Sequence, residues 1–205
     1  MHFTCSMSGS TKKSFYVAFS LKSWLFLNIR SEELEPRCMC FLSTKVPVMA
    51  TLGISTNTRL LGLAIIHKDS LIDYSIHLHK SPWSPAKVTE IITSLEACAR
   101  RYCIKNVVLS IPYAYHQTKA WKFLNASITK FFKTKGIPVR QETPETLYSF
   151  CSSEQKKTKK AMMHSLTLKY PELNYCYYKE LRNRGKYYIK VFEAIAVATI
   201  HEQMK

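Results

Sequence analysis

The sequence predicts an α/β domain built on a mixed five-stranded sheet, in which three antiparallel strands are followed by two parallel strands, with helices on its flanks. Three short apolar or alternating segments follow one another within residues 51–79, with only tight turns between them, as antiparallel strands do. Two later apolar segments, 106–112 and 137–140, each follow a stretch of helical periodicity. Because parallel strands need such crossovers, we expect both segments to run parallel to the first strand. Periodicity alone leaves several α/β folds open.

The first two strands are predicted from two apolar runs, Leu52–Ser55 and Leu60–His67. Between them lies the polar turn Thr56-Asn57-Thr58-Arg59. Asn57 tolerates the left-handed backbone that such a turn requires. The pattern therefore indicates a β-hairpin.

A third strand is predicted over residues 71–79, after a tight turn at 68–70, because apolar and polar residues alternate there. Ile72, Tyr74, Ile76 and Leu78 then share one face, and Asp73, Ser75, His77 and His79 share the other. His77 and His79 are expected on an exposed strand face, with a metal site as the less favoured interpretation.

Two helices are expected to cross over the sheet. Ser84 followed by Pro85 is typical of a helix start, and apolar residues recur at helical spacing from there to Ala99. The second helix is predicted over 118–135, and Gly136 ends it.

The C-terminal part is predicted to be mostly helical. A short helical stretch opens at Thr143, and a second helix begins at Ser152 and ends before Pro171. Residues 174–185 are expected to be irregular, because they are rich in Tyr and Arg. A last helix is predicted over 187–203.

Residues 1–48 are expected to be an N-terminal extension outside the domain, which spans 49–205. The preferred interpretation is that Met49 is the true start and that the preceding residues are upstream sequence read through. A transit peptide is the alternative, since the segment up to Arg30 is basic, rich in Ser and poor in acids.

The charge predicts a polyanionic partner. The formal net charge is +16, which favours nucleic acid ahead of a membrane surface; the plainer interpretation is solubility alone.

The seven cysteines are odd in number and contain no C-x-x-C pair. This pattern argues against structural zinc and against a disulfide framework, and it favours a reducing cytoplasm. No apolar run approaches the roughly 20 residues of a membrane helix.

The hairpin resembles the opening motif of the RNase H-like superfamily in its RuvC resolvase branch. That motif reads Gly-Ile-Asp-Pro-Gly-Thr-Arg, then two residues, then Gly, and its matching residues here are Gly53, Ile54, Thr58, Arg59 and Gly62. Ser55 stands where the family has its first catalytic aspartate. The resemblance implies an RNase H-like fold in which metal-binding carboxylates come from the first strand, the fourth strand and the last helix.

The same resemblance implies a degenerate site. The fourth-strand glutamate position falls on or beside Ser110, and the last-helix motif Asp-Ala-Leu-Ala-Leu-Ala reads Glu193-Ala-Ile-Ala-Val-Ala198, so Glu193 is the one matching carboxylate. A further acid of some relatives falls at Lys190, with the opposite charge. Two hydroxyls and one carboxylate cannot hold a pair of dications, so no metal or other cofactor is expected, and Mg²⁺ would be needed only if the protein were active. Asp73, Glu142 and Glu145 are not expected at the required strand ends. Glu193 can equally be an ordinary first-turn glutamate of its helix.

We therefore expect a degenerate RuvC-like domain that binds DNA or RNA and lacks classical two-metal nuclease activity. The alternatives are a Mg²⁺-dependent, Holliday-junction resolvase-like endonuclease with rearranged acids and a protein-interaction module; a homodimer is compatible with each. Basic residues interleaved with Tyr175, Tyr177, Tyr178, Tyr187 and Tyr188 suit phosphates and unpaired bases, although the tyrosines could instead belong to the core. The expected nucleic-acid-binding residues are Arg59, Lys156, Lys157, Lys159, Lys160, Arg182, Arg184 and Lys186.

Overall fold

The sheet has the strand order β3-β2-β1-β4-β5 in a computed structural model that describes residues 49–148, 157–182 and 187–204. The antiparallel strands β1 (Ala50–Thr56), β2 (Leu60–His67) and β3 (Ser70–Leu78) come first along the chain. Both β4 (Ile104–Ser110) and β5 (Val139–Glu142) run parallel to β1. This arrangement confirms the predicted fold class.

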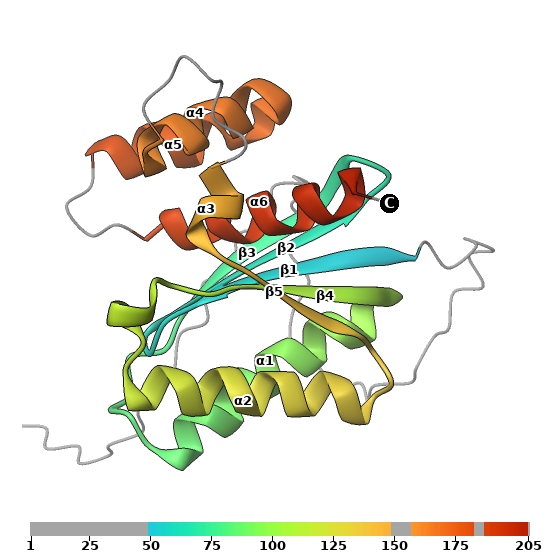
Figure 1. The fold of residues 1–205 in the computed structure, drawn as a ribbon, viewed down its shortest axis with the longest axis vertical. Helices are drawn as coiled ribbons and strands as arrows, with labels where there is room; N and C mark the ends of the chain where they lie inside the picture. Colours follow the sequence, from blue (N-terminus) through green and yellow to red (C-terminus); the bar gives the residue numbers. More distant parts are fainter. Residues whose placement is uncertain (1–48, 149–156, 183–186, 205) are drawn as a thin grey trace, which may run out of the picture.

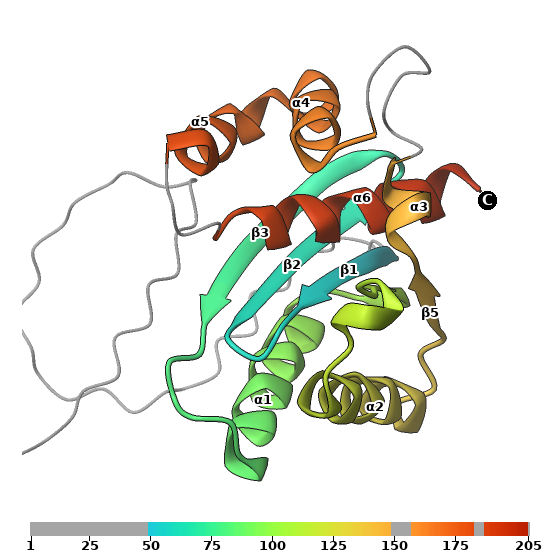
Figure 2. The ribbon, with the colours of Figure 1, turned by 60° about the vertical axis from the view of Figure 1, so that its left-hand side comes forward.

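Helices cover both faces of this sheet (Figures 1 and 2). The crossover helices α1 (Pro85–Arg101) and α2 (Lys119–Thr134) lie on one face. The last helix, α6 (Ile189–Gln203), lies on the other face, and α4 (Lys159–Lys169) and α5 (Asn174–Arg182) pack outside it. Three short helical turns complete the described chain: η1 (Ala114–His116), α3 (Pro144–Leu147) and η3 (Pro171–Leu173).

Local sequence signals set the starts of both crossover helices. The Ser84 hydroxyl accepts a hydrogen bond from the Lys87 backbone N–H, and the Thr118 hydroxyl accepts one from that of Trp121. Gly136, with a φ of 70°, follows α2 as predicted. Trp121 also donates its indole N–H to the Thr56 carbonyl at 3.2 Å, which ties α2 to the end of β1.

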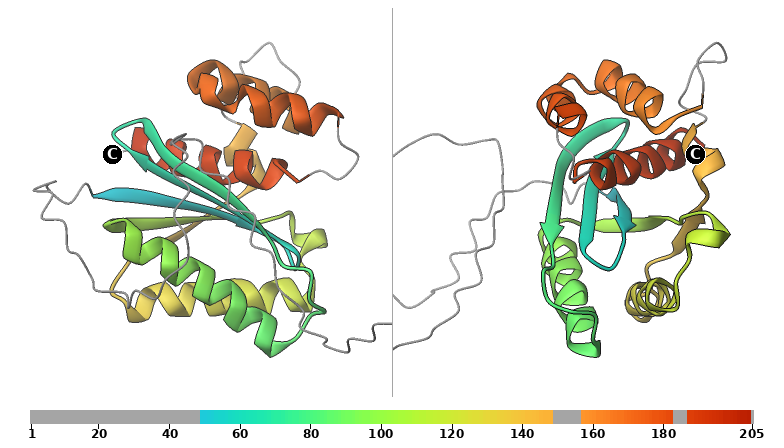
Figure 3. Two further views of the ribbon diagram at one scale, coloured as in Figure 1. Left: turned by 180° about the vertical axis from the view of Figure 1, so that it is seen from behind. Right: turned by 90° about the vertical axis from the view of Figure 1, so that its left-hand side faces the viewer.

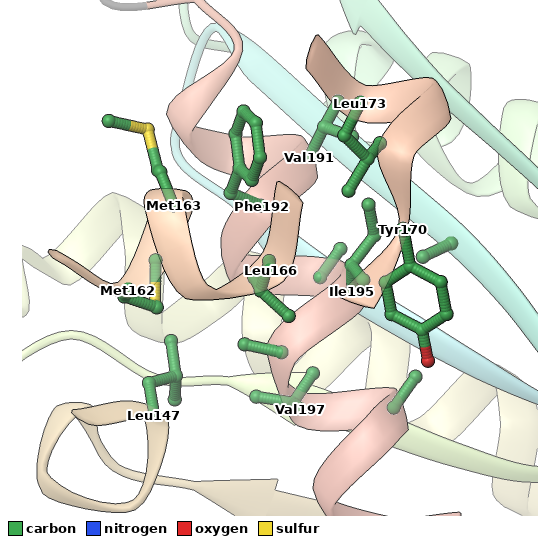
Figure 4. Packing of buried hydrophobic residues seen from close by; sticks show 14 of the residues in the cluster. Leu147, Met162, Met163, Leu166, Tyr170, Leu173, Val191, Phe192, Ile195 and Val197 are labelled. Carbon is green, nitrogen blue, oxygen red and sulfur yellow. The ribbon is translucent and has the colours of Figure 1, made fainter. Parts of the chain in front are cut away.

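The hydrophobic core has two parts, one on each face of the sheet. Figure 3 shows from two further directions the helices that flank these two faces. On the face of α1 and α2, these helices pack on Leu52 and Ile54 of β1 and on β2 and β4. On the other face, α4 and η3 pack on α6, with Leu166, Phe192 and Ile195 among the fully buried side chains (Figure 4). The central strand β1 is thus buried on both faces, as parallel-paired strands usually are.

Two glycines let α6 approach the sheet closely. A Cβ at Gly53 would lie 2.0 Å from the Ala194 carbonyl oxygen, and one at Gly62 would lie 2.3 Å from that of Lys190. Any side chain at either position would force the helix away from β1 and β2. The two glycines of the hairpin motif therefore bring the N-terminal half of α6 directly over the end of β1.

The structure corrects three sequence predictions. Residues 174–182 form the helix α5, because Cys176 and Tyr177 are buried in the core and stabilise a segment whose composition is weakly helical. The fifth strand begins and ends two residues later than predicted, so it includes Gln141 and Glu142. The helix predicted to begin at Ser152 does not run unbroken to its end: Ser152 lies outside the described residues, and the extended residue Thr158 caps α4, which starts at Lys159.

The two histidines of the third strand also differ from the prediction. His79 follows β3 and is buried, with Nδ1 2.9 Å from Glu90 Oε1, and so is not on an exposed face. His77 is half-buried and its Nε2 lies 3.1 Å from the Ser75 hydroxyl. Neither belongs to a metal-binding group, since the described residues contain no cluster of three or more His, Cys, Asp or Glu side chains suited to hold an ion.

Residues 1–48 lie outside the described part of the chain. Within the described part, β1 begins directly after Met49. Within that part, no helix is both long enough and apolar enough to cross a membrane.

Candidate functional site

The three positions singled out by the family resemblance, on the hairpin, the fourth strand and the last helix, meet at one place. Ser55 and Ser110 are neighbours in register near the C-terminal ends of β1 and β4. Glu193 of α6 lies over them, and the Ser55 hydroxyl donates a hydrogen bond of 2.7 Å to Glu193 Oε2. Gly53 explains this geometry, because its lack of a side chain lets α6 rest on β1 at Ala194, the residue directly after Glu193.

Two lysines hold the Glu193 carboxylate, one on each oxygen. Lys190, one turn earlier on α6, donates to Oε2 at 2.7 Å and lies 3.4 Å from the Ser55 hydroxyl. Lys159, the first residue of α4, donates to Oε1 at 2.9 Å. We therefore define the Glu193 cluster as Ser55, Lys159, Lys190 and Glu193.

Burial alone would raise the pKa of Glu193, which is 6% exposed. The charges of Lys190 and Lys159 and the hydrogen bonds that they donate outweigh burial and lower this pKa to about 2. The carboxyl group is therefore ionised at neutral pH and bound to two ammonium groups. It lies in the second turn of α6, whose first turn contains no acidic residue, so the interpretation as a first-turn glutamate is wrong.

The donor set does not fit a pair of Mg²⁺ ions. Mg²⁺ prefers several carboxylate and water oxygens, whereas this cluster offers one carboxylate already shared by two cations. A dication would have to displace both ammonium groups, which repel it.

One acid lies closer than the sequence predicted. Glu142 is the last residue of β5 and the register partner of Ser110, because β5 extends two residues further than expected. Glu142 therefore ends β5 instead of following it as predicted, and lies next to the end of β4. Ser55, Ser110 and Glu142 occupy neighbouring register positions across β1, β4 and β5.

A cavity of about 160 Å³ opens beside the Glu193 cluster. Lys159, Lys190 and Glu193 form one wall, and the segment that leaves β4, including His116, forms another. The remainder consists of Ser110 and of aromatic and apolar residues: Ile111, Pro112, Tyr113, Tyr115, Pro144, Leu147, Tyr148 and Met162. The cavity thus combines two cations with aromatic rings, which is a suitable lining for an anion that carries an aromatic group.

The other predicted nucleic-acid-binding residues are only partly brought together. Lys157 and Lys160 are exposed beside Lys159 at the start of α4. Arg59 is exposed in the turn between β1 and β2, and Arg182 is exposed at the end of α5. Lys156, Arg184 and Lys186 lie outside the described residues.

The tyrosines of the same region divide between surface and core. Tyr175, Tyr178 and Tyr187 are exposed, whereas Tyr177 is buried in the core cluster and Tyr188 packs against it. Sequence reasoning missed Tyr113, Tyr115 and Tyr148, which line the cavity. The position of Tyr113 and Tyr115 directly after the fourth strand was the signal available for two of them.

No family model and no curated protein matches the chain. Solved structures do match. Thermus thermophilus RuvC in complex with a Holliday junction substrate is 18% identical, with a TM-score of 0.57 over 75% of this chain and 92% of that chain. The same protein in a second structure gives a TM-score of 0.55. The fowlpox virus resolvase, solved with Holliday junction DNA, is 12% identical over 76% of this chain and 98% of its own, with a TM-score of 0.47.

The likeness to RuvC establishes the class of fold. The chain has an RNase H-like fold of the RuvC-like kind. The resemblance inferred from the hairpin is thereby confirmed at the level of the fold.

Proposed function

We propose that this protein binds nucleic acid at the Glu193 cluster through lysine ammonium groups, without two-metal cleavage. The observation that carries the proposal is the pairing of Glu193 with both Lys159 and Lys190. Each lysine places a positive charge next to the carboxylate that, by the resemblance to RuvC-like enzymes, would hold metal.

The cluster favours a phosphate for a simple electrostatic reason. Two ammonium groups and one carboxylate leave a net charge of +1, and the cavity next to them is lined in part by the same two lysines. Lys159 has a 56% exposed side chain, so its remaining N–H groups can reach a phosphate oxygen. Exposed Lys157 and Lys160 add charge at the same end of α4.

The RuvC and fowlpox virus structures contain Holliday junction DNA, so four-way junction DNA is a sensible probe beside single-stranded DNA. Fluorescence anisotropy with labelled DNA in EDTA measures binding. We expect the wild type to bind in EDTA and its affinity to fall steeply with salt, since phosphate contacts release counterions.

The decisive variant is Lys159→Gln/Lys190→Gln/Glu193→Gln, which removes both cations and the carboxylate that they neutralise. We expect its affinity to fall about tenfold, or about 1.4 kcal/mol. Glu193→Gln alone is the matched control, and it should bind at least as tightly as the wild type because it removes a negative charge. Equal affinity of the triple variant and the wild type would contradict the proposal.

The specific rival is a Mg²⁺-dependent nuclease with rearranged acids, which the position of Glu142 beside Ser110 favours. Incubation of junction and single-stranded DNA with Mg²⁺ or Mn²⁺ separates the two. We expect no product; cleavage that disappears in Glu193→Gln or Glu142→Gln would overturn the proposal.

A further inference from the structure

A second, larger cavity lies along α2, on the face of the sheet opposite α6. It is an open groove of about 690 Å³ between α2, the edge strand β5 and the segment that leaves β4 (Figure 2 shows α2 beside β5). We call it the α2 groove and define it by its lining residues: Ile111, Gln117, Trp121, Lys122, Asn125, Ala126, Thr129, Lys130, Lys133, Thr134 and Gln141.

The charge of the α2 groove has one sign. Lys122, Lys130 and Lys133 line it, and none of its lining residues, all within the described part of the chain, is acidic. The helix α2 itself contains no Asp or Glu. None of these three lysines takes part in a salt bridge among the described residues, so their charges are not neutralised by a neighbouring carboxylate.

The spacing of the lysines suits an extended polyanion. Lys122 and Lys133 are eleven positions apart on one flank of α2. At about 1.5 Å per residue, they lie about 16 Å apart along the helix axis. Along the axis of a duplex, one strand presents a phosphate about every 3.4 Å, so this length spans about five phosphates of one strand.

Neutral hydrogen-bonding groups accompany the lysines. Gln117, Asn125 and Gln141 line the same groove, and amides both donate and accept hydrogen bonds. Such groups contact sugars and phosphates in nucleic acid interfaces. A purely apolar partner surface would leave these groups and three ammonium groups without water, which is costly.

The α2 groove adjoins the cavity of the Glu193 cluster. Ile111 lines both, and the segment 111–117 runs between them, where Gln117 donates a hydrogen bond to the Pro112 carbonyl at 3.0 Å. A strand that leaves the cavity can therefore continue over this segment into the groove.

We propose that the α2 groove binds the phosphate backbone of a nucleic acid strand whose other part occupies the cavity at the Glu193 cluster. This inference rests on the proposed nucleic-acid function but uses different residues on the other face of the sheet. The expected occupant of the α2 groove is therefore nucleic acid and not a second copy of this chain.

The test compares Lys122→Gln/Lys130→Gln/Lys133→Gln with the wild type on a long and a short labelled single strand. For the long strand, we expect weaker binding and a slope of log K against log salt that is smaller by about 2, since each phosphate contact contributes about 0.7. For an oligonucleotide too short to extend beyond the cavity, we expect wild-type affinity. Lys68→Gln/Lys105→Gln/Lys179→Gln removes three exposed lysines that line neither cavity and should lower the slope far less.

Each other result has a definite meaning. If Lys122→Gln/Lys130→Gln/Lys133→Gln (the groove variant) keeps the wild-type salt slope while Lys159→Gln/Lys190→Gln/Glu193→Gln loses affinity, this inference is overturned and the proposed function stays intact. Loss in the groove variant alone supports the groove and overturns the role of the Glu193 cluster. Absence of DNA and RNA binding by the wild type overturns both. A change of sedimentation coefficient in the groove variant, with unchanged thermal unfolding, would identify the groove as an interface between copies and overturn the inference.

Discussion

Glu193 is a buried carboxylate that is stable as an anion because lysines from two different helices surround it. Lys190 lies one turn before Glu193 on α6, and Lys159 is the first residue of α4. Removal of one partner from a buried ion pair is costly, because it leaves the other charge without solvent or counter-charge. At the scale of the residue, the cluster is therefore a stability element as well as a candidate phosphate site.

This pairing predicts a pH dependence of stability. The pKa of Glu193 is about 2 in the folded protein against 4.5 for a free glutamate, so the unfolded state takes up its proton first as pH falls. The stabilisation is therefore present above about pH 5 and is lost toward pH 2. Between about pH 5 and pH 3 we expect the wild type to lose about 2 kcal/mol of unfolding free energy that Glu193→Gln does not lose. Urea titrations of both proteins at the two pH values measure this difference, and parallel losses would contradict the assigned pKa.

The position of α6 decides whether the cluster forms at all. Gly53 and Gly62 allow the backbone of α6 to touch β1 and β2, so the hairpin and the last helix, far apart in sequence, make one site. The hairpin motif could be read from the sequence because its turn chemistry and glycines are local. The helix pairing could be inferred only through the family resemblance.

Gly53→Ala tests this close approach. The new Cβ would meet the Ala194 carbonyl oxygen at 2.0 Å, so we expect a loss of about 3 kcal/mol, at the upper end of overpacking effects. Gly136→Ala is the control, because it has a φ of 70° but no atom within 4 Å of a Cβ, and it should cost about 1 kcal/mol of backbone strain. Chemical denaturation compares them; an equal or smaller loss in Gly53→Ala would show that α6 does not need the glycine.

Elements defined by local signals were predicted well, and elements defined by tertiary contacts were not. Ser84 caps α1 as predicted, and α2 starts within one residue of its predicted start with Thr118 as its cap, because a cap is a contact between near neighbours in sequence. By contrast, α5 is short, and its buried residues Cys176 and Tyr177 stabilise it by packing into the core that α4 and α6 form. The Lys159–Glu193 pair spans 34 residues, so no spacing rule could reveal it.

At the scale of the whole molecule, the proposed function combines a RuvC-like fold with serines and a lysine at positions where the resemblance implies metal-binding carboxylates. Ser55→Asp/Ser110→Glu/Lys190→Asp would place carboxylates beside Glu193 at the positions suggested by the resemblance. We expect this variant, unlike the wild type, to bind Mn²⁺ in isothermal titration calorimetry, because carboxylates suit this ion. If the restored variant folds and binds no Mn²⁺, the assignment of these positions is wrong.

The most direct test of the central claim is the metal dependence of DNA binding by the unmodified protein. The dissociation constant for a labelled single strand is measured in EDTA and then with Mn²⁺ at the same ionic strength. If the lysine ammonium groups take the place of metal ions, the two constants will agree and the strand will remain intact. Binding that appears only with Mn²⁺, or cleavage of the strand in its presence, would contradict the account.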